Sequence, residues 1–418
     1  MAGRTLWSVL TLVALVAGVV LGEKALVLVD SPELESTHSQ FIGDLSDLGL
    51  ELDVQPIDSS SLRLKLWDEW IYDKLVILGG SKELGGALDA VLLMEFVDAG
   101  NDLLLILAPT PTDEMRDVAT ALGVDLDAAG SRVLDHTRYD AGRGHAAVLG
   151  AQSLLARVFS GAARGPLVFS GMGLSVAPAS ELTMLALHGV PTAYSAGADG
   201  KPTGLAGRAL GLVALAQARN NARALVLAGL DFVSNDLFDA SVTDADGNSL
   251  GASGNRAAAR DLAAWALSRR GVLRLVDMSH SIVGGEVAPE RYRIKDEVEV
   301  YARIEELVDG QWVGYDASDV KIELVMLDPY IRQSMESDGD GNFRVRVTVP
   351  DVYGVFKWVL DYARPSLSRL HWVETVPIRP FAHNEYDRFI LQAYPYYASI
   401  FTLMAAFLVS GVAFIYTK

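Results

Sequence analysis

Residues 103–107 have the sequence LLLIL, an uninterrupted apolar run with the length of a buried strand. Two similar runs precede it, LVIL at 75–78 and ALVLV at 25–29. A strand that is apolar at every position is covered on both faces, which is typical of a parallel sheet between helices. Apolar residues with helical spacing separate these runs and follow the last of them: Phe41, Leu45 and Leu48; Leu88, Val91, Leu92 and Phe96; Met115, Val118 and Leu122. Residues 23–150 are therefore predicted to form an α/β domain with a largely parallel sheet.

Two local signals refine this α/β prediction. The pair Thr110-Pro111 predicts that the third helix begins with Pro111 at its first position. The glycines of 79–80 are interpreted as part of a loop that needs freedom in φ, because the stretch to Gly86 lacks the spacing of a dinucleotide-binding loop.

The rest of the chain changes from an α/β to a β pattern. Residues 151–271 are less regular, but contain a buried strand at 224–227 and a helix from about Arg256 to Arg270, and we interpret them as a continuation of the α/β region or a middle domain. Residues 272–388 show the period-two alternation of strands, which predicts an antiparallel, β-sandwich-like domain. The alternating sets are Val298, Val300, Ala302 and Ile304; Val320, Ile322, Leu324 and Met326; Phe343, Val345, Val347 and Val349; Phe356, Trp358, Leu360 and Tyr362.

Both ends of the chain carry membrane-targeting patterns. Residues 1–22 have one positive charge, Arg4, an apolar run and small residues before Glu23, as a cleaved signal peptide does. Residues 394–416 are predicted to be a transmembrane helix with tyrosines at both edges, leaving 417–418 as a cytosolic tail. A removable lipid-anchor signal is the rival interpretation, but no small-residue cleavage site with a polar spacer precedes the apolar run.

Small side chains recur on one face of this helix. Thr402, Ala406 and Ser410 are spaced by four residues, so they lie along one stripe. Small residues allow a second helix to approach closely in lipid. The stripe is a candidate helix-packing surface, with chance in an alanine-rich segment as the open alternative.

The composition excludes several classes of function. The 418 residues have a formal net charge of −18, and a nucleic-acid partner would need a basic surface. The chain has no cysteine, so disulfides, thiol nucleophiles and cysteine-ligated zinc are excluded. It also has no Asn-X-Ser/Thr acceptor, and should not itself be N-glycosylated.

One possible ligand site follows the first strand. Asp30 and Ser31 end that strand, and Thr37 and His38 are expected to begin the next helix. Polar groups at the carboxyl end of a parallel sheet line the crevice where such folds bind ligands, and these four could bind a glycan. The alternative is that Ser36 or Thr37 is only a helix cap.

A search for catalytic and metal motifs finds none with the required spacing, so we predict no catalytic residue, no metal site and no cofactor. His136 with Asp135 and Asp140 could bind a metal, but a solvated loop is the favoured interpretation. Residues 338–341 (DGDG) resemble a calcium loop, yet Phe343 and Val349 stand where that loop needs Gly and Glu, which favours a hairpin turn.

Several segments resemble one family in order along the chain. They are RNNAR at 219–223 leading into the strand and LDF at 230–232, PDVYGVF at 350–356, and YDRFILQAYPYYAS at 386–399. Together with Asp30, residues 37–39 and residues 72–73, they resemble the non-catalytic, single-span lumenal subunit of the eukaryotic oligosaccharyltransferase.

This resemblance implies a structural role in N-linked glycosylation. The complex transfers a preassembled glycan from dolichyl diphosphate to the Asn of Asn-X-Ser/Thr in nascent lumenal proteins, and a different, multi-span subunit carries the active site. The resemblance also implies a glutaminase-like lumenal fold proposed to bind sugars, other subunits as partners, and a type I location in the endoplasmic reticulum membrane.

Two other hypotheses remain at this point. One is a stand-alone hydrolase or transferase that uses a pair of carboxylates as acid and base. The other is a stand-alone type I membrane carbohydrate-binding protein of the secretory pathway, although the very short predicted tail offers little room for sorting signals.

Overall fold

The computed structural model describes residues 23–417 except 150, 153–157, 160–164, 178–179, 286 and 309. The predicted signal peptide, 1–22, and Lys418 of the predicted tail lie outside the described residues. The chain forms two compact units. Unit 1 consists of the chain up to Arg274 together with the segments Glu305–Tyr315 and Ala363–Leu370. Unit 2 consists of Leu275–Ile304, Asp316–Tyr362 and His371–Lys418.

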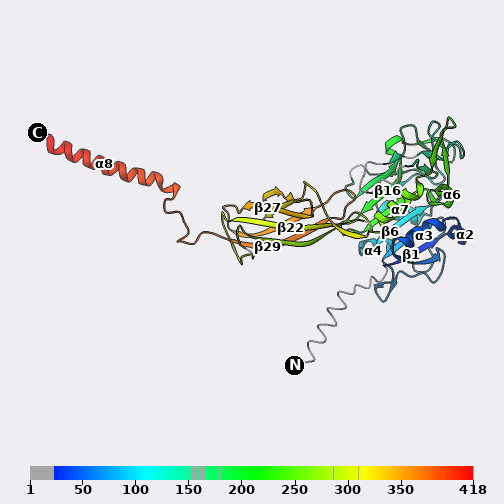
Figure 1. Ribbon diagram of the computed structural model, residues 1–418, viewed down its shortest axis with the longest axis horizontal. Coiled ribbons are helices and arrows are strands. Elements are labelled where there is room, and N and C mark those ends of the chain that lie inside the picture. The colour runs from blue at the N-terminus through cyan, green and yellow to red at the C-terminus, as the bar shows by residue number, and fades with distance from the viewer. Residues whose placement is uncertain are drawn as a thin grey trace, which may run out of the picture. The chain divides into compact units, whose positions relative to one another are not determined.

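A mixed sheet forms the centre of unit 1 (Figure 1). The strands of its main path, in spatial order, are β10 (Ala151–Gln152), β13 (Thr183–His188), β16 (Gly211–Gln217), β17 (Arg223–Leu227), β6 (Asp102–Leu107), β5 (Lys74–Gly79), β1 (Glu23–Val29) and β2 (Leu50–Pro56). The pairings from β17 to β2 are parallel, as the apolar runs predict. The pairings from β17 to β10 are antiparallel, which the sequence did not predict. β12 (Leu174–Val176) pairs with β16 and with β7 (Val124–Leu126).

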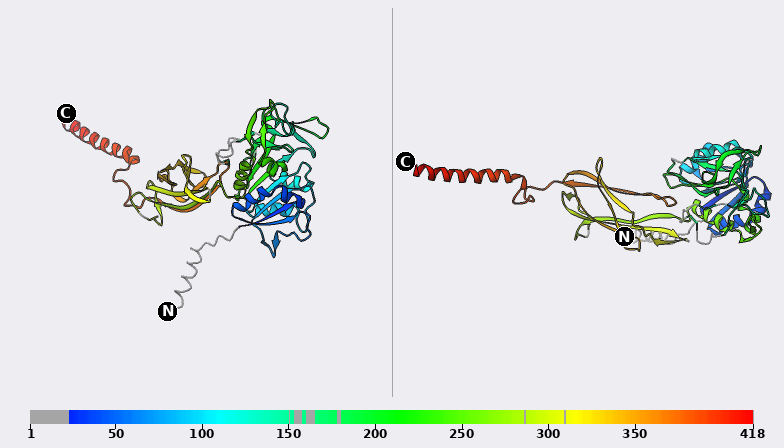
Figure 2. Two further views of the ribbon diagram at one scale, coloured as in Figure 1. Left: turned by 45° about the vertical axis from the view of Figure 1, so that its right-hand side comes forward. Right: turned by 90° about the horizontal axis from the view of Figure 1, so that it is seen from above.

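Helices cover both faces of this sheet (Figures 1 and 2). α3 (Ser39–Asp47) and α7 (Asn255–Ala266) pack into the apolar core that contains Ala25, Val27 and Val29 of β1. α4 (Ala90–Asp98) and α5 (Asp113–Ala121) pack into the core on the other face, which contains Leu26 and Leu28. Successive residues of β1 thus enter two different cores, which explains why the strand is apolar throughout.

Two predicted helix ends are wrong by a few residues. α5 begins at Asp113 rather than Pro111, because Thr112 is its N-cap and accepts a hydrogen bond from the N–H of Met115. α7 ends at Ala266 rather than Arg270. Ser268 has a φ of 57°, and the N–H of Arg269 donates to the Ala264 carbonyl at 2.7 Å, a Schellman-type ending.

Shorter elements complete unit 1. The helices are α2 (Pro32–Thr37) and α6 (Asn235–Phe238), with 3-10 turns at Gly207–Ala209 and Leu230–Val233. The small sheets pair β3 (Lys65–Leu66) with β4 (Glu69–Trp70), β9 (Val148–Leu149) with β11 (Val168–Phe169), β18 (Ser241–Thr243) with β19 (Ser249–Ala252), and β14 (Tyr194–Ala196) with β8 (Arg132–Leu134) and β15 (Pro202–Ala206).

Unit 2 is built from two five-stranded sheets. One has the order β20 (Val272–Ile282), β22 (Glu297–Val308), β27 (Asn342–Thr348), β26 (Glu336–Ser337), and the end of β22 pairs with β23 (Gln311–Gly314) within unit 1. The other has the order β21 (Tyr292–Arg293), β29 (Leu370–Arg379), β28 (Gly354–Tyr362), β24 (Lys321–Val325), β25 (Pro329–Ser334). The predicted alternation is confirmed, since Val298, Val300, Ala302 and Ile304 are all fully buried.

The DGDG stretch forms the predicted hairpin turn. It joins β26 to β27, and the Asp338 carboxylate accepts hydrogen bonds from the backbone N–H groups of Asp340 and Asn342. Gly339 and Gly341 both have a φ of 88°, which explains the two glycines. The Asp338 side chain is thus part of an Asx-type turn.

Candidate functional site

The strand order of unit 1 places a topological switch point between β1 and β5. β2 lies on one side of β1, whereas β5 and β6 lie on the other, and open α/β sheets bind ligands at such a point. Asp30 follows β1 there and is only 7% exposed. Its carboxylate accepts hydrogen bonds from the N–H groups of Gly80 and Ser81, both at 2.9 Å, and from the Ser81 hydroxyl at 2.6 Å. Asp30 therefore joins the ends of two neighbouring strands.

Position 79 must be a glycine for the Asp30 carboxylate to make these hydrogen bonds. It has a φ of 114°, and a Cβ atom at this position would lie 2.3 Å from Oδ2 of Asp30. Gly80 also has positive φ, at 68°, which confirms the predicted conformational demand of this loop. The switch point is thus closed by a carboxylate that fits only against a residue without a side chain.

The other three predicted site residues lie along α2 and its junction with α3. Ser31 is the N-cap position of α2, half-buried, and its hydroxyl makes no hydrogen bond within the described residues. Thr37 is exposed, and its hydroxyl lies 3.2 Å from the Glu33 carbonyl and 2.9 Å from Nδ1 of His38. The alternative of a Ser36 or Thr37 cap is wrong, because α2 continues to Thr37 and His38 is the N-cap residue of α3.

His38 is buried, with 4% of its surface exposed, and its Nε2 lies 3.2 Å from the Leu230 carbonyl. We assign the proton of the neutral ring to Nε2, which donates to Leu230, while Nδ1 accepts from the Thr37 hydroxyl. Burial lowers the pKa of His38, and the carbonyls of Leu230 and Leu34 only partly oppose this effect. The imidazole thus connects α2 to the turn after β17.

Asp135 and Asp140 do not lie in a solvated loop, and that interpretation is wrong for both. Each is fully buried. Burial alone would raise the pKa of Asp135, but hydrogen bonds from Thr192, Arg138 and Thr137 lower it below its usual value. Asp140 is held in the same way by Thr243, Arg143 and Gly142. Both carboxylates organise loops through hydrogen bonds that the sequence does not reveal.

His136, in contrast, is exposed. Its ring lies 4.7 Å from the ring of His145, and its Nε2 lies 3.0 Å from the Tyr194 hydroxyl. No group of three or more potential metal ligands occurs among the described residues. The absence of a metal site stays a prediction.

The RNNAR turn at 219–223 acts as a junction within unit 1. The Asn220 amide donates to the carbonyls of Val97 and Asp98 at the end of α4. The fully buried Arg223 guanidinium donates to the carbonyls of Trp265, Arg270 and Gly271, and thereby caps the end of α7. Burial lowers the pKa of Arg223 to about 10. These contacts explain the structural roles of Asn220 and Arg223, which the sequence analysis used only as part of a family resemblance.

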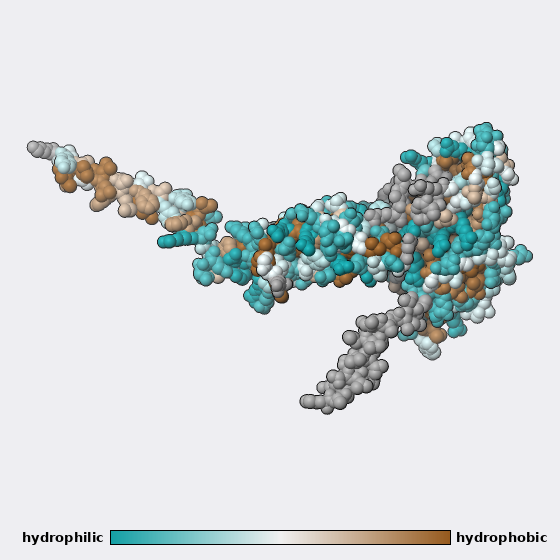
Figure 3. Space-filling model, in the orientation of Figure 1, coloured by the Kyte–Doolittle hydropathy of each residue, from teal (hydrophilic) through white to brown (hydrophobic). Residues whose placement is uncertain are grey.

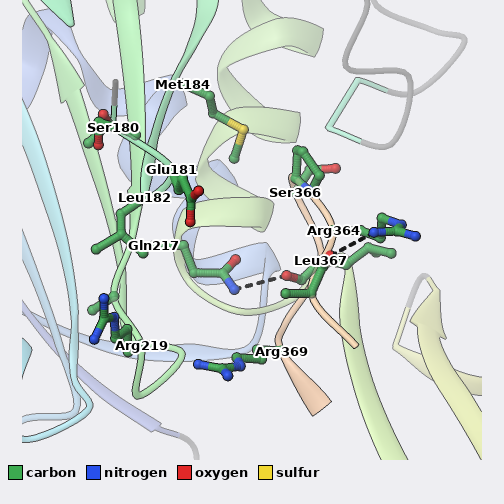
Figure 4. A pocket seen from close by; sticks show the side chains of 14 residues that line it. Ser180, Glu181, Leu182, Met184, Gln217, Arg219, Arg364, Ser366, Leu367 and Arg369 are labelled. Atoms are coloured by element: carbon green, nitrogen blue, oxygen red, sulfur yellow. Dashed lines mark hydrogen bonds between the residues drawn. The ribbon is translucent and has the colours of Figure 1, made fainter. Parts of the chain in front are cut away.

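A pocket of about 1020 Å³ lies beside this turn, within unit 1 (Figure 4). It is lined by residues 180–184 before and in β13, 217–219 after β16, and 363–367 with 369. Figure 4 shows Glu181 and Gln217 facing the 363–369 segment, with a hydrogen bond of 2.9 Å from the Gln217 amide to the Leu367 carbonyl. Sequence reasoning missed this pocket, because its three walls are far apart in the chain.

The C-terminal helix α8 spans Tyr394–Tyr416, as predicted. Together with the preceding turn it forms an apolar stretch of 26 residues, Leu391–Tyr416, with a mean hydropathy of 2.2. None of its residues is buried (Figure 3, where the helix is largely brown). Its length and composition suit a single membrane crossing. Thr402 and Ser410 of the predicted stripe donate their hydroxyls to carbonyls one turn earlier, which satisfies both groups inside the helix.

Comparisons with known proteins agree over most of the chain. Residues 17–269 match the family model described as OST48, N-terminal domain, and residues 280–418 match the OST48 middle domain. The 48 kDa subunit of dolichyl-diphosphooligosaccharide–protein glycosyltransferase from Arabidopsis thaliana is 36% identical over 406 residues, covering 94% of this chain and 93% of that protein. The Danio rerio protein of the same name is 34% identical over 418 residues, covering 97% and 94%.

Solved structures give only a distant likeness. A ThuA-like protein from Parabacteroides merdae is 11% identical, with 59% of this chain and 90% of that protein covered and a TM-score of 0.30.

The fold and the terminal helix define a class, that of sheet-rich α/β proteins with one candidate membrane span among the described residues. The two family matches and the near-full-length similarity make the assignment specific: the chain belongs to the OST48 family.

Proposed function

We propose that this chain is a structural, non-catalytic subunit of the oligosaccharyltransferase complex, needed for its assembly and for transfer of a preassembled glycan to asparagine. The single observation that carries this proposal is the similarity to 48 kDa subunits over more than nine-tenths of the chain. The partners are the other subunits of the complex, including a multi-span subunit that carries out the chemistry.

The proposed topology follows from the chain ends. Residues 1–22 are removed as a signal peptide, α8 crosses the endoplasmic reticulum membrane, and residues 417–418 are cytosolic. The bulk of the chain is then lumenal, with an α/β domain at 23–150, its continuation at 151–271 and a membrane-proximal β-rich domain at 272–388. The candidate span of 26 residues supports this arrangement.

A non-catalytic role agrees with how the polar groups of unit 1 are used. A glutaminase-like enzyme needs a nucleophilic thiol after a strand, and the sequence contains no cysteine. Asp30, Asp135 and Asp140 are buried and accept several hydrogen bonds each, so their carboxylates hold loops in place. We propose the glutaminase-like fold for unit 1 because the family resemblance implies it, and a sandwich for the two sheets of unit 2 because their strands alternate apolar and polar residues.

Glycan binding at Asp30, Ser31, Thr37 and His38 stays a prediction. Ser31 is the member of this set whose hydroxyl has no partner among the described residues. A glycan contact would therefore fall on Ser31 first. Ser31→Ala should weaken crosslinking to a photoreactive donor glycan if this site is used, and leave it unchanged if the four residues only shape the loop.

The function is tested by purification from membranes. The chain is tagged at its C-terminus, solubilised in mild detergent, and the eluate is assayed for co-purifying subunits and for peptide glycosylation. Recovery of a multi-span subunit together with transferase activity is the expected result. A folded chain that purifies alone, with no activity, would refute the proposal.

A further inference from the structure

We propose that the pocket beside the 219–223 turn binds an acidic peptide segment of a neighbouring subunit, and that Arg219 contacts its carboxylate. This inference rests on the proposed function, since it requires that the chain assembles with other subunits. Four features of the described structure support it: an exposed arginine without a partner in the described residues, a lining with more arginines than acidic residues, an exposed leucine, and a wall that is fixed before binding.

Arg219 is the residue of this turn whose polar side-chain groups make no contact that stabilises the fold. Asn220 and Arg223 cap α4 and α7, and Asn221 holds the 363–370 segment. Arg219 is exposed, lines the pocket, and makes no polar contact within the described residues. An exposed guanidinium on a pocket wall presents a fork of donors that matches a carboxylate.

The charge around the pocket favours an anion. Three arginines, Arg219, Arg364 and Arg369, line it against one acidic residue, Glu181. The whole chain carries a formal net charge of −18, so this concentration of positive charge is locally opposite to the rest. A concave surface lined by one sign of charge attracts ligands of the other sign.

The apolar part of the pocket lining favours a peptide over a phosphate. Leu182 lines the pocket and is 45% exposed, so it can contact an apolar side chain of a bound segment, whereas a phosphate has no apolar group to place there. The Gln217 side chain is held in place because its Nε2 donates to the Leu367 carbonyl at 2.9 Å. A peptide that carries both a carboxylate and an apolar side chain can contact Arg219 and Leu182 together.

The wall formed by residues 363–370 is held before any ligand arrives. The Asn221 amide pairs with both backbone groups of Arg369, at 3.0 and 2.7 Å. Nε1 of Trp265 donates to the Ser366 carbonyl at 2.8 Å, and the N–H of Ser368 donates to the Gly271 carbonyl at 3.0 Å. A preorganised wall reduces the entropy cost of binding. The volume of about 1020 Å³ is at the upper end of the ~300–1,000 Å³ typical of small-molecule sites, which suits several peptide residues.

The experiment uses the full-length tagged chain in membranes. A photo-crosslinking amino acid replaces Leu182, and the crosslinked species is identified by mass spectrometry. We expect one peptide of a co-purifying subunit with Asp or Glu beside the crosslink. A crosslink to the lipid-linked donor, to this same chain, or to no molecule at all would overturn the inference.

A charge reversal provides the second readout. Arg219→Glu should lower recovery of the crosslinked subunit about tenfold, and a change of the acidic residue in the crosslinked peptide to Lys should restore it. Arg208→Glu is the matched control, because Arg208 is also an exposed arginine of unit 1 without a polar contact in the described residues, and lies outside the pocket.

The two proposals fail in different ways. If the unaltered chain recovers no other subunit, the proposed function is wrong and the pocket inference falls with it. If the unaltered chain and the Arg219→Glu variant recover the same subunits in the same amounts, the function stands and the pocket inference is wrong.

Discussion

The Arg223 guanidinium lies 4.7 Å from the ring centroid of Trp265 and donates a hydrogen bond of 2.9 Å to the carbonyl of the same residue. Two further carbonyls, of Arg270 and Gly271, accept from the same guanidinium at 2.6 Å. A buried charge is costly unless its donors find acceptors. Here the three carbonyls at and after the end of α7 accept from Nη1 and Nη2, while Nε is buried without a partner in the described residues. One arginine thus joins β17 to the helix that covers it.

Replacement of this arginine should destabilise unit 1. Arg223→Lys keeps the charge but cannot reach all three carbonyls, so the free energy of unfolding should fall by about 3 kcal/mol. Tryptophan fluorescence during denaturation of the detergent-solubilised chain measures the change. Arg219→Lys in the same turn serves as the control and should leave the midpoint unchanged. Equal midpoints for the two variants would contradict the capping role of Arg223.

Gly79→Ala should be far more harmful than a glycine substitution with the same backbone demand. At Gly79 the new Cβ would lie 2.3 Å from Asp30, whereas at Gly100, with a φ of 101°, it would meet nothing within 4 Å. Gly100→Ala therefore reports the backbone cost alone, about 1 kcal/mol. We expect Gly79→Ala to cost at least about 2 kcal/mol more, because the hydrogen bonds of the Asp30 carboxylate to Gly80 and Ser81 must break. Similar losses for the two variants would mean that these hydrogen bonds contribute little to stability.

Stability should fall in mild acid through His38. Its folded pKa is lowered, so the unfolded chain binds the proton more tightly, and the stabilisation is complete above the unfolded value of about 6.5. It is lost as the pH falls from there through the folded pKa. Denaturation midpoints between pH 7 and pH 5 should drop more steeply for the unaltered chain than for His38→Gln. His383→Gln, at an exposed histidine, should keep the slope of the unaltered chain; a slope that His38→Gln leaves unchanged would assign the effect elsewhere.

The small-residue stripe of α8 remains a prediction and can be tested with neighbouring alanines. Ala406→Leu enlarges the stripe that also contains Thr402 and Ser410, and should reduce co-purification of membrane subunits several-fold. Ala405→Leu makes the same change about 100° around the helix. The measurement is quantitative mass spectrometry of the detergent-solubilised eluate. An equal effect of both substitutions would indicate general disturbance of the helix instead of a packing face.

The sequence predicted those elements whose pattern follows directly from burial. The run at 103–107 became β6, and the helix at 394–416 became α8 without a change of bounds. The antiparallel strand β13 escaped prediction because it has irregular register and only partial burial, which weakens its pattern. Its neighbour β16 is buried at its first six residues and was not predicted either. Asp135 was misplaced in solvent because its burial depends on donors from Thr192 and Thr137, contacts that exist only in the folded chain.

The candidate sites were also predictable from the sequence only in part. Gly79 and Gly80 were predicted to lie in a loop that needs freedom in φ, but the reason, the Asp30 carboxylate at the end of the neighbouring strand β1, lies 49 and 50 positions away in the sequence. The pocket could not be predicted at all, since Gln217 and Leu367 are separated by 150 positions. Arg219 could not be singled out either, because only the folded chain shows that Asn220, Asn221 and Arg223 of the same turn all make contacts that stabilise the fold.

The return of residues 363–370 to unit 1 also determines when that unit can be finished during synthesis. Nε1 of Trp265 donates to the Ser366 carbonyl, which lies 101 positions later in the chain. The strands β24 to β28 are translated before this carbonyl is available. Domains usually complete their folding in the order in which they leave the ribosome. Unit 1 is therefore incomplete until most of unit 2 has been translated, so a nascent chain arrested before residue 363 would expose an incomplete unit 1 to chaperones.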